Sequence, residues 1–369
     1  MNPSPAPADL AGAYRLRPGR QPAIVGERPV LEGRRLAALM QGLPAARAPQ
    51  ACAAVFTLCA HAQRRTSEAA VRAAGGAAPE IDPAGLQFET ARDHLRSIAL
   101  DWPARAGTAP QLAWLRESPL RIAGAAPPDA AAAQAALRAF GAWLADTVLH
   151  RSPAEWLARC AAPPALKAWC DEQAEAFPPA RTLRDWHALA SRIEIACTPL
   201  RILMAEPGAC EANLRTLAGA LATETDFAQL PRWRGQAREN GPWTRQRDDA
   251  HATPPATAWD RLAARWIELV ALAAADAPPM LQQGALQLAP GEAIAWCEMA
   301  RGLLFHWVRL DANGCVQDYR VLAPTEWNFH PQGSLARALE RLAPSDTEAA
   351  ALLGTAFDAC VPCTVAPAP

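Results

Sequence analysis

The stretch GLLFHWVRLDANGCVQDYRVL, Gly302 to Leu322, contains two apolar runs separated by a turn at Asn313-Gly314. An Asn-Gly pair between two such runs is the strongest short-range signal for a β-hairpin. This alternating region begins near residue 285, whereas helical patterns fill most of the chain before it and return after it. We therefore predict a mainly α protein with a small C-terminal β element, which is an α+β fold.

The helical patterns have recognisable starts and stops. Residues from about 33 to 75 are predicted to be helical, and the second helix there starts at Pro49 and stops at Gly75-Gly76. A further helix over PAGLQFETARDHLRSIALDWP is predicted to end at Pro103. Asp129 is the expected N-cap of a long amphipathic helix.

Two segments lack a helical pattern. Residues 1–30 are rich in Pro and Gly, and we expect them to form an edge strand or an extended N-terminal arm. Residues 225–257 are polar and rich in Arg, Trp, Asn and Gly, which predicts a loop region. Because a loop of this length is uncommon inside a compact domain, we expect it to be functional or partly mobile.

The composition is that of a globular protein without a strongly charged partner. Hydrophobic residues make up 51% of the chain, charged residues make up 20%, and the net charge is -1, so nothing predicts nucleic-acid binding. No run approaches the roughly 18 uninterrupted apolar residues of a membrane span, and no secretory signal pattern is visible. We expect a cytoplasmic protein whose ten cysteines are mostly reduced and buried thiols.

Cys360 and Cys363 lie three positions apart in the C-terminal stretch FDACVPCTVAPAP. Two thiolates at this spacing chelate a soft metal or exchange with disulfides. A zinc site would need a second such pair or a pair of histidines, and a thioredoxin-like motif would start a helix after a strand. The sequence contains neither, so the motif alone leaves metal binding, disulfide exchange and a minor structural role open.

Three C-terminal segments resemble the large subunit of [NiFe] hydrogenases. EMARGLLFHW, starting at Glu298, is similar to the EAPRGxLxHW segment of that family, and VLAPTEWN, ending at Asn328, is similar to VVPTTWN. FDACVPC, starting at Phe357, is similar to FDPCxxC. The three segments keep the order and the approximate spacing of the family, which makes the match more specific than any one of them.

The N-terminal half carries two weaker matches. VFTLCAHAQRRTSEA is similar to RICGVCxxxHxxAS, and RDHLRSIALDWP is similar to HDHLxHFYxLxxLDW. Together the matches cover roughly residues 60–120 and 285–366. The resemblance implies a single large-subunit-like domain over residues 1–369, with a helical bundle core.

In that family, four cysteines hold nickel and an iron that carries two cyanides and one carbonyl. The resemblance places Cys59 and Cys363 at the two iron-bridging positions and Cys360 at a terminal nickel position. Phe56 stands at the fourth position and has no donor atom. The resemblance therefore implies a site that binds an Fe(CN)2CO unit transiently, with no nickel expected.

Other positions extend this interpretation. Ala366 replaces the histidine that marks tail cleavage in the family, and Gln63 replaces the histidine after the N-terminal pair, so neither tail cleavage nor a closed nickel–iron site is expected. Arg301, Asp93 and Asp358 match the arginine and the two aspartates that form a canopy over the metals. A guanidinium offers several fixed donors to cyanide nitrogens, and carboxylates hold it in place.

The combined pattern resembles the HupK/HoxV-type hydrogenase accessory family, whose members are degenerate relatives of the large subunit. The resemblance implies a non-enzymatic scaffold that receives the Fe(CN)2CO unit from maturation chaperones and passes it to the hydrogenase large-subunit precursor. In this hypothesis Cys59 and Cys363 bind the iron, and Cys360 is an exchangeable thiol. The alternatives are a protein-only chaperone that mimics the shape of the large subunit, a redox-active CxxC protein, and a true hydrogenase, which Phe56 disfavours.

Overall fold

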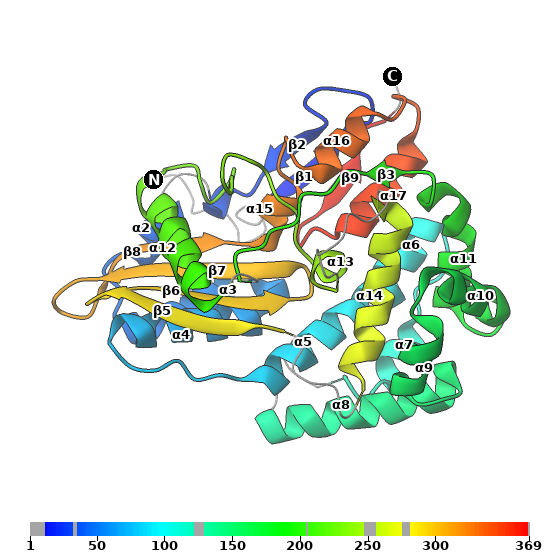
Figure 1. Cartoon of the computed structure of the whole chain (residues 1–369), viewed down its shortest axis with the longest axis horizontal. Coiled ribbons are helices and arrows are strands. Elements are labelled where there is room, and N and C mark those ends of the chain that lie inside the picture. Colours follow the sequence, from blue (N-terminus) through cyan, green and yellow to red (C-terminus); the bar gives the residue numbers. More distant parts are fainter. Residues whose placement is uncertain are drawn as a thin grey trace, which may run out of the picture.

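The computed structural model describes residues 12–31, 35–121, 129–203, 206–246, 256–274 and 281–367. Parts of the predicted N-terminal arm and of the polar loop region, residues 1–11 and 247–255, lie outside the described residues. Helices surround a small twisted sheet, which lies toward one side of the molecule (Figure 1). The predicted α+β class is confirmed. No helix among the described residues combines the length and the apolar character that crossing a bilayer requires.

Four antiparallel strands follow one another in chain order: β5 (Gln283–Ala289), β6 (Glu292–Met299), β7 (Gly302–Leu310) and β8 (Val316–Leu322). The predicted hairpin is formed by β7 and β8, with Phe305 opposite Leu322. Its turn is closed by Asp311, whose Oδ1 accepts hydrogen bonds from the backbone N–H groups of Asn313 and Cys315.

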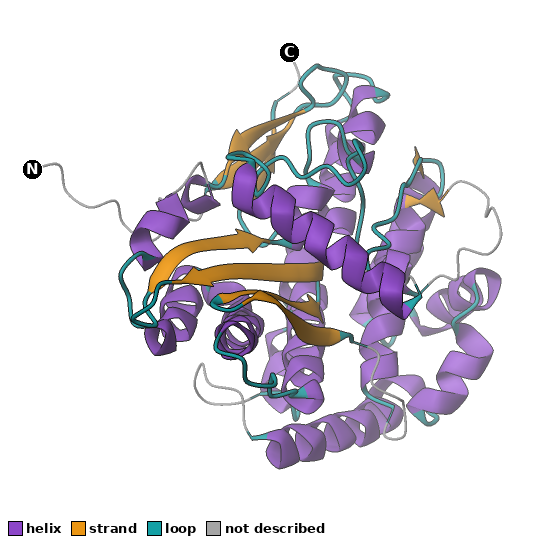
Figure 2. Cartoon of the chain, turned by 60° about the vertical axis from the view of Figure 1, so that its left-hand side comes forward, coloured by secondary structure: helices purple, strands orange, loops and turns teal. Residues whose placement is uncertain are grey.

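Helices cover both faces of this sheet (Figure 2). α4 (Ala60–Ala74) packs on one face, and α12 (Pro207–Thr223) lies across the other. Along β7 the side chains alternate between two cores: Phe305 packs with the α12 cluster, and Leu304 packs with the main core. Because both faces are covered, β7 reads as a continuous buried run instead of alternating with polar residues.

The long helix α14 (Ala258–Leu272) runs through the interior, and nearly all its residues are buried. It lies beside α5 (Pro83–Arg96) and α17 (Thr347–Phe357). Asp129 caps α8 (Ala130–Leu144) as predicted, since its side chain accepts from the N–H of Ala132. The remaining described α-helices are α2 (Arg35–Met40), α3 (Ala48–Val55), α6 (Trp102–Ala106), α7 (Leu112–Glu117), α9 (Pro153–Cys160), α10 (Pro163–Gln173), α11 (Pro178–Ala190), α13 (Pro242–Arg245), α15 (Pro324–Asn328) and α16 (Ser334–Glu340).

The predicted helix end at Pro103 is wrong. After α5 the chain continues through a π-helical turn, Ser97–Asp101, directly into α6, and leaves the helix at Gly107 with a φ of 67°. Pro103 lies in the first turn of α6, where its missing N–H has the lowest cost.

The helix predicted to start at Pro49 is also broken in the middle. α3 ends at Val55, Phe56 leaves the helical region with φ -110° and ψ 68°, and a 3-10 turn, Thr57–Cys59, leads into α4. Cys59 therefore becomes the N-cap residue of α4. This break turns a cysteine that would lie mid-helix into one at a helix start.

A second sheet joins the two ends of the described chain. β1 (Ala13–Leu16) pairs antiparallel with β2 (Ile24–Glu27), and it pairs parallel with β9 (Cys363–Val365), so that Tyr14 is opposite Cys363. A short pair, β3 (Glu194–Ile195) with β4 (Ala256–Thr257), lies at the start of α14. The β1–β9 pairing fixes where the second of the two C-terminal cysteines lies.

Candidate functional site

The structure brings Arg301, Asp93 and Asp358 together from three separate elements. Arg301 Nη1 lies 3.3 Å from Asp93 Oδ2 of α5, and its Nε lies 3.3 Å from Asp358 Oδ2 at the end of α17. Arg265 of α14 approaches the same Asp358 oxygen at 3.6 Å. Burial alone would raise the pKa of Asp358, but Arg265 and Arg301 hold it below its ordinary value. The predicted canopy residues therefore form one charged cluster.

Gly302 explains how Arg301 is positioned before β7. Its φ is 129°, and a Cβ there would lie 1.6 Å from Asn240 Oδ1, so only glycine fits. Asn240 Oδ1 accepts from the N–H of Leu303 at 2.7 Å, while the side chain of Asn328 donates to the carbonyl of Arg301 at 3.3 Å. The turn that presents Arg301 is thus held by two asparagines.

The polar segment 225–257 contributes a third arginine to this region. Arg245 of α13 donates to both carboxylate oxygens of Glu268, at 2.6 and 2.9 Å, and His94 Nε2 lies 2.7 Å from the same group. Burial raises the pKa of Glu268, but Arg245 outweighs this effect and brings the pKa to about 2. Because His94 follows Asp93, this buried cluster holds the turn of α5 that carries Asp93.

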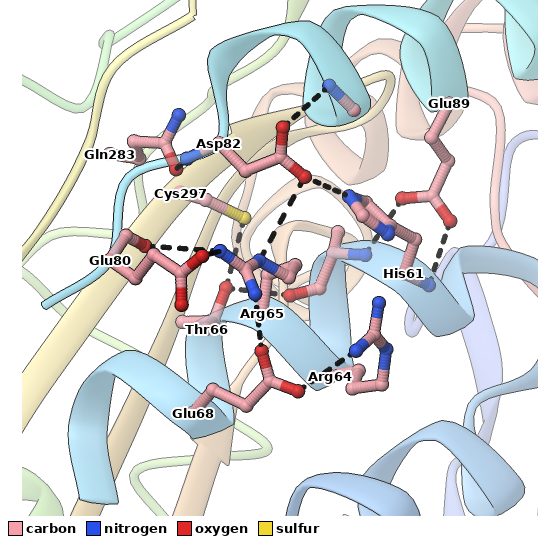
Figure 3. Close-up of polar contacts among 12 residues, drawn as sticks. His61, Arg64, Arg65, Thr66, Glu68, Glu80, Asp82, Glu89, Gln283 and Cys297 are labelled. Atoms are coloured by element: carbon pink, nitrogen blue, oxygen red, sulfur yellow. Dashed lines mark hydrogen bonds and ion pairs between the residues drawn. The ribbon is translucent and has the colours of Figure 1, made fainter. Parts of the chain in front are cut away.

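Cys59 is held at the start of α4 by a carboxylate from another helix. Glu89 of α5 accepts from the backbone N–H groups of His61 at 2.9 Å and Ala62 at 2.8 Å (Figure 3). These donors have no partner within the helix, so Glu89 satisfies them and fixes the helix start. The imidazole of His61 lies 3.4 Å from Asp82, and Cys59 is only 4% exposed.

Gln63 connects the Cys59 sulfur to a chain of buried polar groups. Its Nε2 donates to Cys59 Sγ at 3.7 Å, and its Oε1 lies 2.8 Å from His306 Nε2. His306 Nδ1 in turn lies 2.6 Å from the hydroxyl of Tyr319, which lies 2.6 Å from Ser67 Oγ. Burial lowers the pKa of His306 to about 3, so the imidazole is neutral. The glutamine that replaces a family histidine thus orients a donor toward the sulfur.

Cys360 faces the same region from the other end of the chain. Its Sγ lies 3.2 Å from Thr325 Oγ1 of α15. Burial, and then a Cys360 thiolate, raise the pKa of Cys59. Burial lowers the pKa of Arg301, but Asp358, Asp93 and then the Cys360 and Cys59 thiolates raise it above its ordinary value. The charges of Cys59, Cys360 and Arg301 therefore act on one another, and Cys360 and Arg301 line the same cavity.

Cys363 stands apart from these two sulfurs. It lies on β9 against α17, where a Cβ on Gly354 would be 3.6 Å from its Sγ. Burial raises its pKa to about 11, and the charge of Arg105 opposes this shift. Among the described residues, no three His, Cys, Asp or Glu side chains are grouped closely enough to hold a metal ion. The three predicted thiols are not assembled into one ligand set in this structure.

A cavity of about 560 Å³ leads to the canopy. Arg301 and Asp358 line it together with Cys360 and Cys363, and the side chains of Arg96, Asp101 and Arg105 also contribute to its wall. A second cavity, of about 920 Å³, shares Cys363 and Arg105 with the first. Both C-terminal cysteines are therefore reachable from open space, unlike Cys59.

Several residues of this region carry no signal in the sequence. Arg28 forms a buried ion pair with Glu326 at 3.0 Å, and its Cζ lies 5.5 Å from the centre of the Phe56 ring. Asn240 and Arg245 lie in the segment that reads as a loop. Their partners are distant in sequence, so no local pattern could identify them.

Comparison with known proteins identifies relatives of this chain. No protein-family model matches it. It is 38% identical to the hydrogenase expression/formation protein HoxV of Cupriavidus necator over 96% of this chain and 95% of that relative. It is 29% identical to the hydrogenase expression/formation protein HupK of Rhizobium leguminosarum bv. viciae, over 92% and 90% of the two chains.

Solved structures support the same fold. A [NiFeSe] hydrogenase chain of Desulfovibrio vulgaris Hildenborough covers 92% of this chain with a TM-score of 0.51 and 16% identity. The predicted large-subunit-like fold and the predicted family are both confirmed. The chain belongs to the HoxV/HupK family of hydrogenase expression/formation proteins, built on the fold of the [NiFe] hydrogenase large subunit.

Proposed function

We propose that this protein is a scaffold in [NiFe] hydrogenase formation that holds an Fe(CN)2CO unit as cargo and passes it to the hydrogenase large-subunit precursor. The names of its relatives support the broader role in hydrogenase formation. The observation that carries the finer proposal is the canopy: Arg301, fixed by two carboxylates, lines one cavity together with Cys360, and the thiolates of Cys360 and Cys59 both act on its charge.

The chemistry of these groups suits such a cargo. Cyanide nitrogens accept hydrogen bonds, and a guanidinium fixed by Asp93 and Asp358 offers its donors without reorganisation. Thiols lose their protons when they bind iron, and the positive charge of Arg301 stabilises the thiolates that form. Phe56 offers no fourth ligand, so no stoichiometric nickel is expected.

The arrangement of the cysteines supports a different pair of iron ligands from the one that the resemblance implies. The charges of Cys59 and Cys360 act on each other and on Arg301, whereas Cys363 lies against α17. We assign Cys59 and Cys360 as the cargo thiols and Cys363 as the exchangeable thiol that enters during capture or release. Cys363 lines both cavities, so an incoming or leaving unit meets it first.

The cavity over the C-terminal cysteines supplies a route for hand-over. Arg96 and Arg105 line it, and their charge favours a unit that carries two cyanides. In this proposal maturation chaperones deliver the unit through this cavity, and the large-subunit precursor collects it there. The protein itself carries out no catalytic turnover.

The test is infrared spectroscopy on protein purified anaerobically from a host with the hydrogenase maturation machinery. Cyanide and carbonyl bands are expected in the wild type and are lost in Cys59→Ala and in Cys360→Ala. Cys363→Ala keeps the bands but slows their transfer to precursor, and Cys315→Ala is the matched control outside the site. A wild type without bands, or bands that survive the double variant Cys59→Ala/Cys360→Ala, would contradict the proposal.

A protein-only chaperone is the second candidate. It is favoured by one observation, namely that the described residues contain no preformed metal-ligand group. In that case Cys59→Ala/Cys360→Ala would still support hydrogenase formation in a cell that lacks the wild-type gene. Loss of hydrogenase formation in this variant, with normal protein levels, would exclude this candidate.

A further inference from the structure

Arg28 is a second buried guanidinium beside the cysteines, and it lies outside every segment that the resemblance covers. Its side chain is 4% exposed, and its Nη1 donates to Glu326 Oε1 at 3.0 Å. Its Cζ lies 5.5 Å from the centre of the Phe56 ring, so the guanidinium contacts the residue that replaces a nickel ligand. Its Nε is buried and has no hydrogen-bond partner among the described residues.

The neighbours of Arg28 connect it to both halves of the cysteine site. Phe56 precedes the turn that ends at Cys59. Glu326 follows Thr325, whose hydroxyl contacts the sulfur of Cys360. The guanidinium is therefore anchored by one residue from each half.

The contact with Phe56 places the guanidinium next to the turn that leads to Cys59. The charges around Arg28 agree with this position. Burial lowers the pKa of Arg28, but a Cys360 thiolate, and then Glu326, raise it above its ordinary value; a Cys59 thiolate acts in the same direction.

A fixed positive charge at this place opposes a divalent ion. Ni²⁺ or Co²⁺ would have to displace thiol protons and bring two further positive charges next to a group that cannot deprotonate. The Phe56 ring and the ion pair with Glu326 prevent the guanidinium from turning away.

We propose that Arg28 is a specificity-determining residue, whose guanidinium, held by Glu326 and Phe56, excludes divalent metal ions from the Cys59–Cys360 pair. The identity of the cargo that Arg28 permits comes from the proposed function, so this part of the inference rests on that proposal. Iron(II) with two cyanides is neutral, so the unit bound by two thiolates carries two negative charges. Arg28 balances part of this negative charge. In the hydrogenase site, the same negatively charged unit lies beside nickel.

The test is metal binding to the full chain, produced without maturation genes and kept reduced and anaerobic. Co²⁺ is titrated and followed by its thiolate charge-transfer absorption, and Ni²⁺ is measured by equilibrium dialysis. Arg28→Met/Glu326→Gln replaces the ion pair by neutral side chains of similar size and leaves no buried charge unpaired. It is expected to bind Co²⁺ at least about tenfold more tightly than the wild type, and adding Cys59→Ala is expected to abolish this gain.

Two controls separate charge from general loosening of the structure. Arg28→Lys keeps the positive charge and is expected to bind Co²⁺ as weakly as the wild type. Arg309→Met removes a partly exposed arginine of β7, paired with Glu292 at 3.1 Å, and is also expected to bind Co²⁺ as the wild type does. If the double variant does not fold, Glu326→Gln alone serves, since it keeps the cation and is expected to bind no more tightly than the wild type.

The inference is overturned if the folded double variant gains no affinity, or if Glu326→Gln or Arg309→Met gains as much as the double variant. Tight Co²⁺ or Ni²⁺ binding by the wild type would also overturn it. These outcomes do not depend on infrared bands. A wild type without cyanide and carbonyl bands, combined with the expected titration, would remove the proposed cargo and leave the exclusion role intact.

Discussion

The two halves of the cysteine site are held in different ways. Cys59 sits at a helix start that is fixed by Glu89 and by a chain of buried polar groups beginning at Gln63. Cys360 lies two positions after the left-handed residue Asp358, and in the described part of the chain its sulfur has one hydrogen-bond contact, with Thr325. Local opening is easiest where few buried contacts hold a segment. The comparison indicates one fixed sulfur, that of Cys59, and one more movable sulfur, that of Cys360, an arrangement suited to capture and release.

Removing the Glu89 side chain is expected to destabilise the Cys59 half of the site more than any other change proposed here. Glu89→Ala leaves two helix-start N–H groups buried without partners, and we expect a loss of about 3 kcal/mol in the free energy of unfolding. Urea unfolding measures this loss. Glu155→Ala is the matched control, because Glu155 belongs to the exposed capping box of α9 and should lower the stability clearly less than Glu89→Ala does. Equal losses in the two variants would contradict the assigned role.

Thiol reactivity sharpens the same contrast. Cys360 and Cys363 are partly buried and border open cavities, whereas Cys59 is buried and burial raises its pKa. We expect iodoacetamide to modify the C-terminal pair about a hundredfold faster than Cys59, since Cys59 reacts only after local opening. Peptide mass mapping against time measures the rates. Cys52, also buried, should behave as Cys59 does; comparable rates for all four would show that the halves do not differ.

His306 makes the fixed half sensitive to acid. Burial holds its pKa at about 3 in the folded protein, below the ordinary value of 6.5 that applies in the unfolded chain. The unfolded state therefore binds a proton that the folded state excludes, so stability is full above pH 6.5 and falls as the pH drops from 6.5 toward 3. The slope from one such group approaches about 1.4 kcal/mol per pH unit. Urea unfolding of His306→Gln between pH 7 and 5 should show a slope shallower by up to this amount; an unchanged slope would contradict the prediction.

A substitution in the Cys360 half of the site is expected to have the smallest effect on stability. Thr325→Val keeps the shape of the side chain and removes its contact with the Cys360 sulfur, so we expect a stability loss of less than about 1 kcal/mol. The alkylation rate of Cys360 should rise a few-fold, while that of Cys59 stays unchanged. An equal rise at both cysteines would mean that Thr325 supports the whole site.

Local patterns predicted the hairpin and the long helices, because Asn313-Gly314 and the Asp129 cap act over a few residues. They failed where distant groups decide the structure. The chain breaks at Phe56 without a glycine or proline, since Glu89 from another helix supplies the cap for α4. Pro103 was misread as a terminator because the π-helical turn before it is not visible in the sequence.

The same difference between local and long-range signals applies to the site. The resemblance identified Arg301, Asp93 and Asp358, and the structure brings them together. The resemblance gave no indication of Arg28, Asn240 or Arg245, because each acts through a partner that is distant in the sequence. Arg28 and Glu326, for example, are 298 residues apart. Sequence patterns report which residue types are present, whereas these ion pairs depend on which elements meet.

The parallel pairing of β9 with β1 has a consequence for the order of folding. Tyr14 and Cys363 are about 350 residues apart, and contacts of such long range form late because the intervening chain must be closed first. During synthesis, residues 13–16 wait for their partner strand until residues 363–365 have left the ribosome. A nascent chain can thus order the Cys59 half of the site early, but Cys360 and Cys363 reach their places only in the final stage of folding.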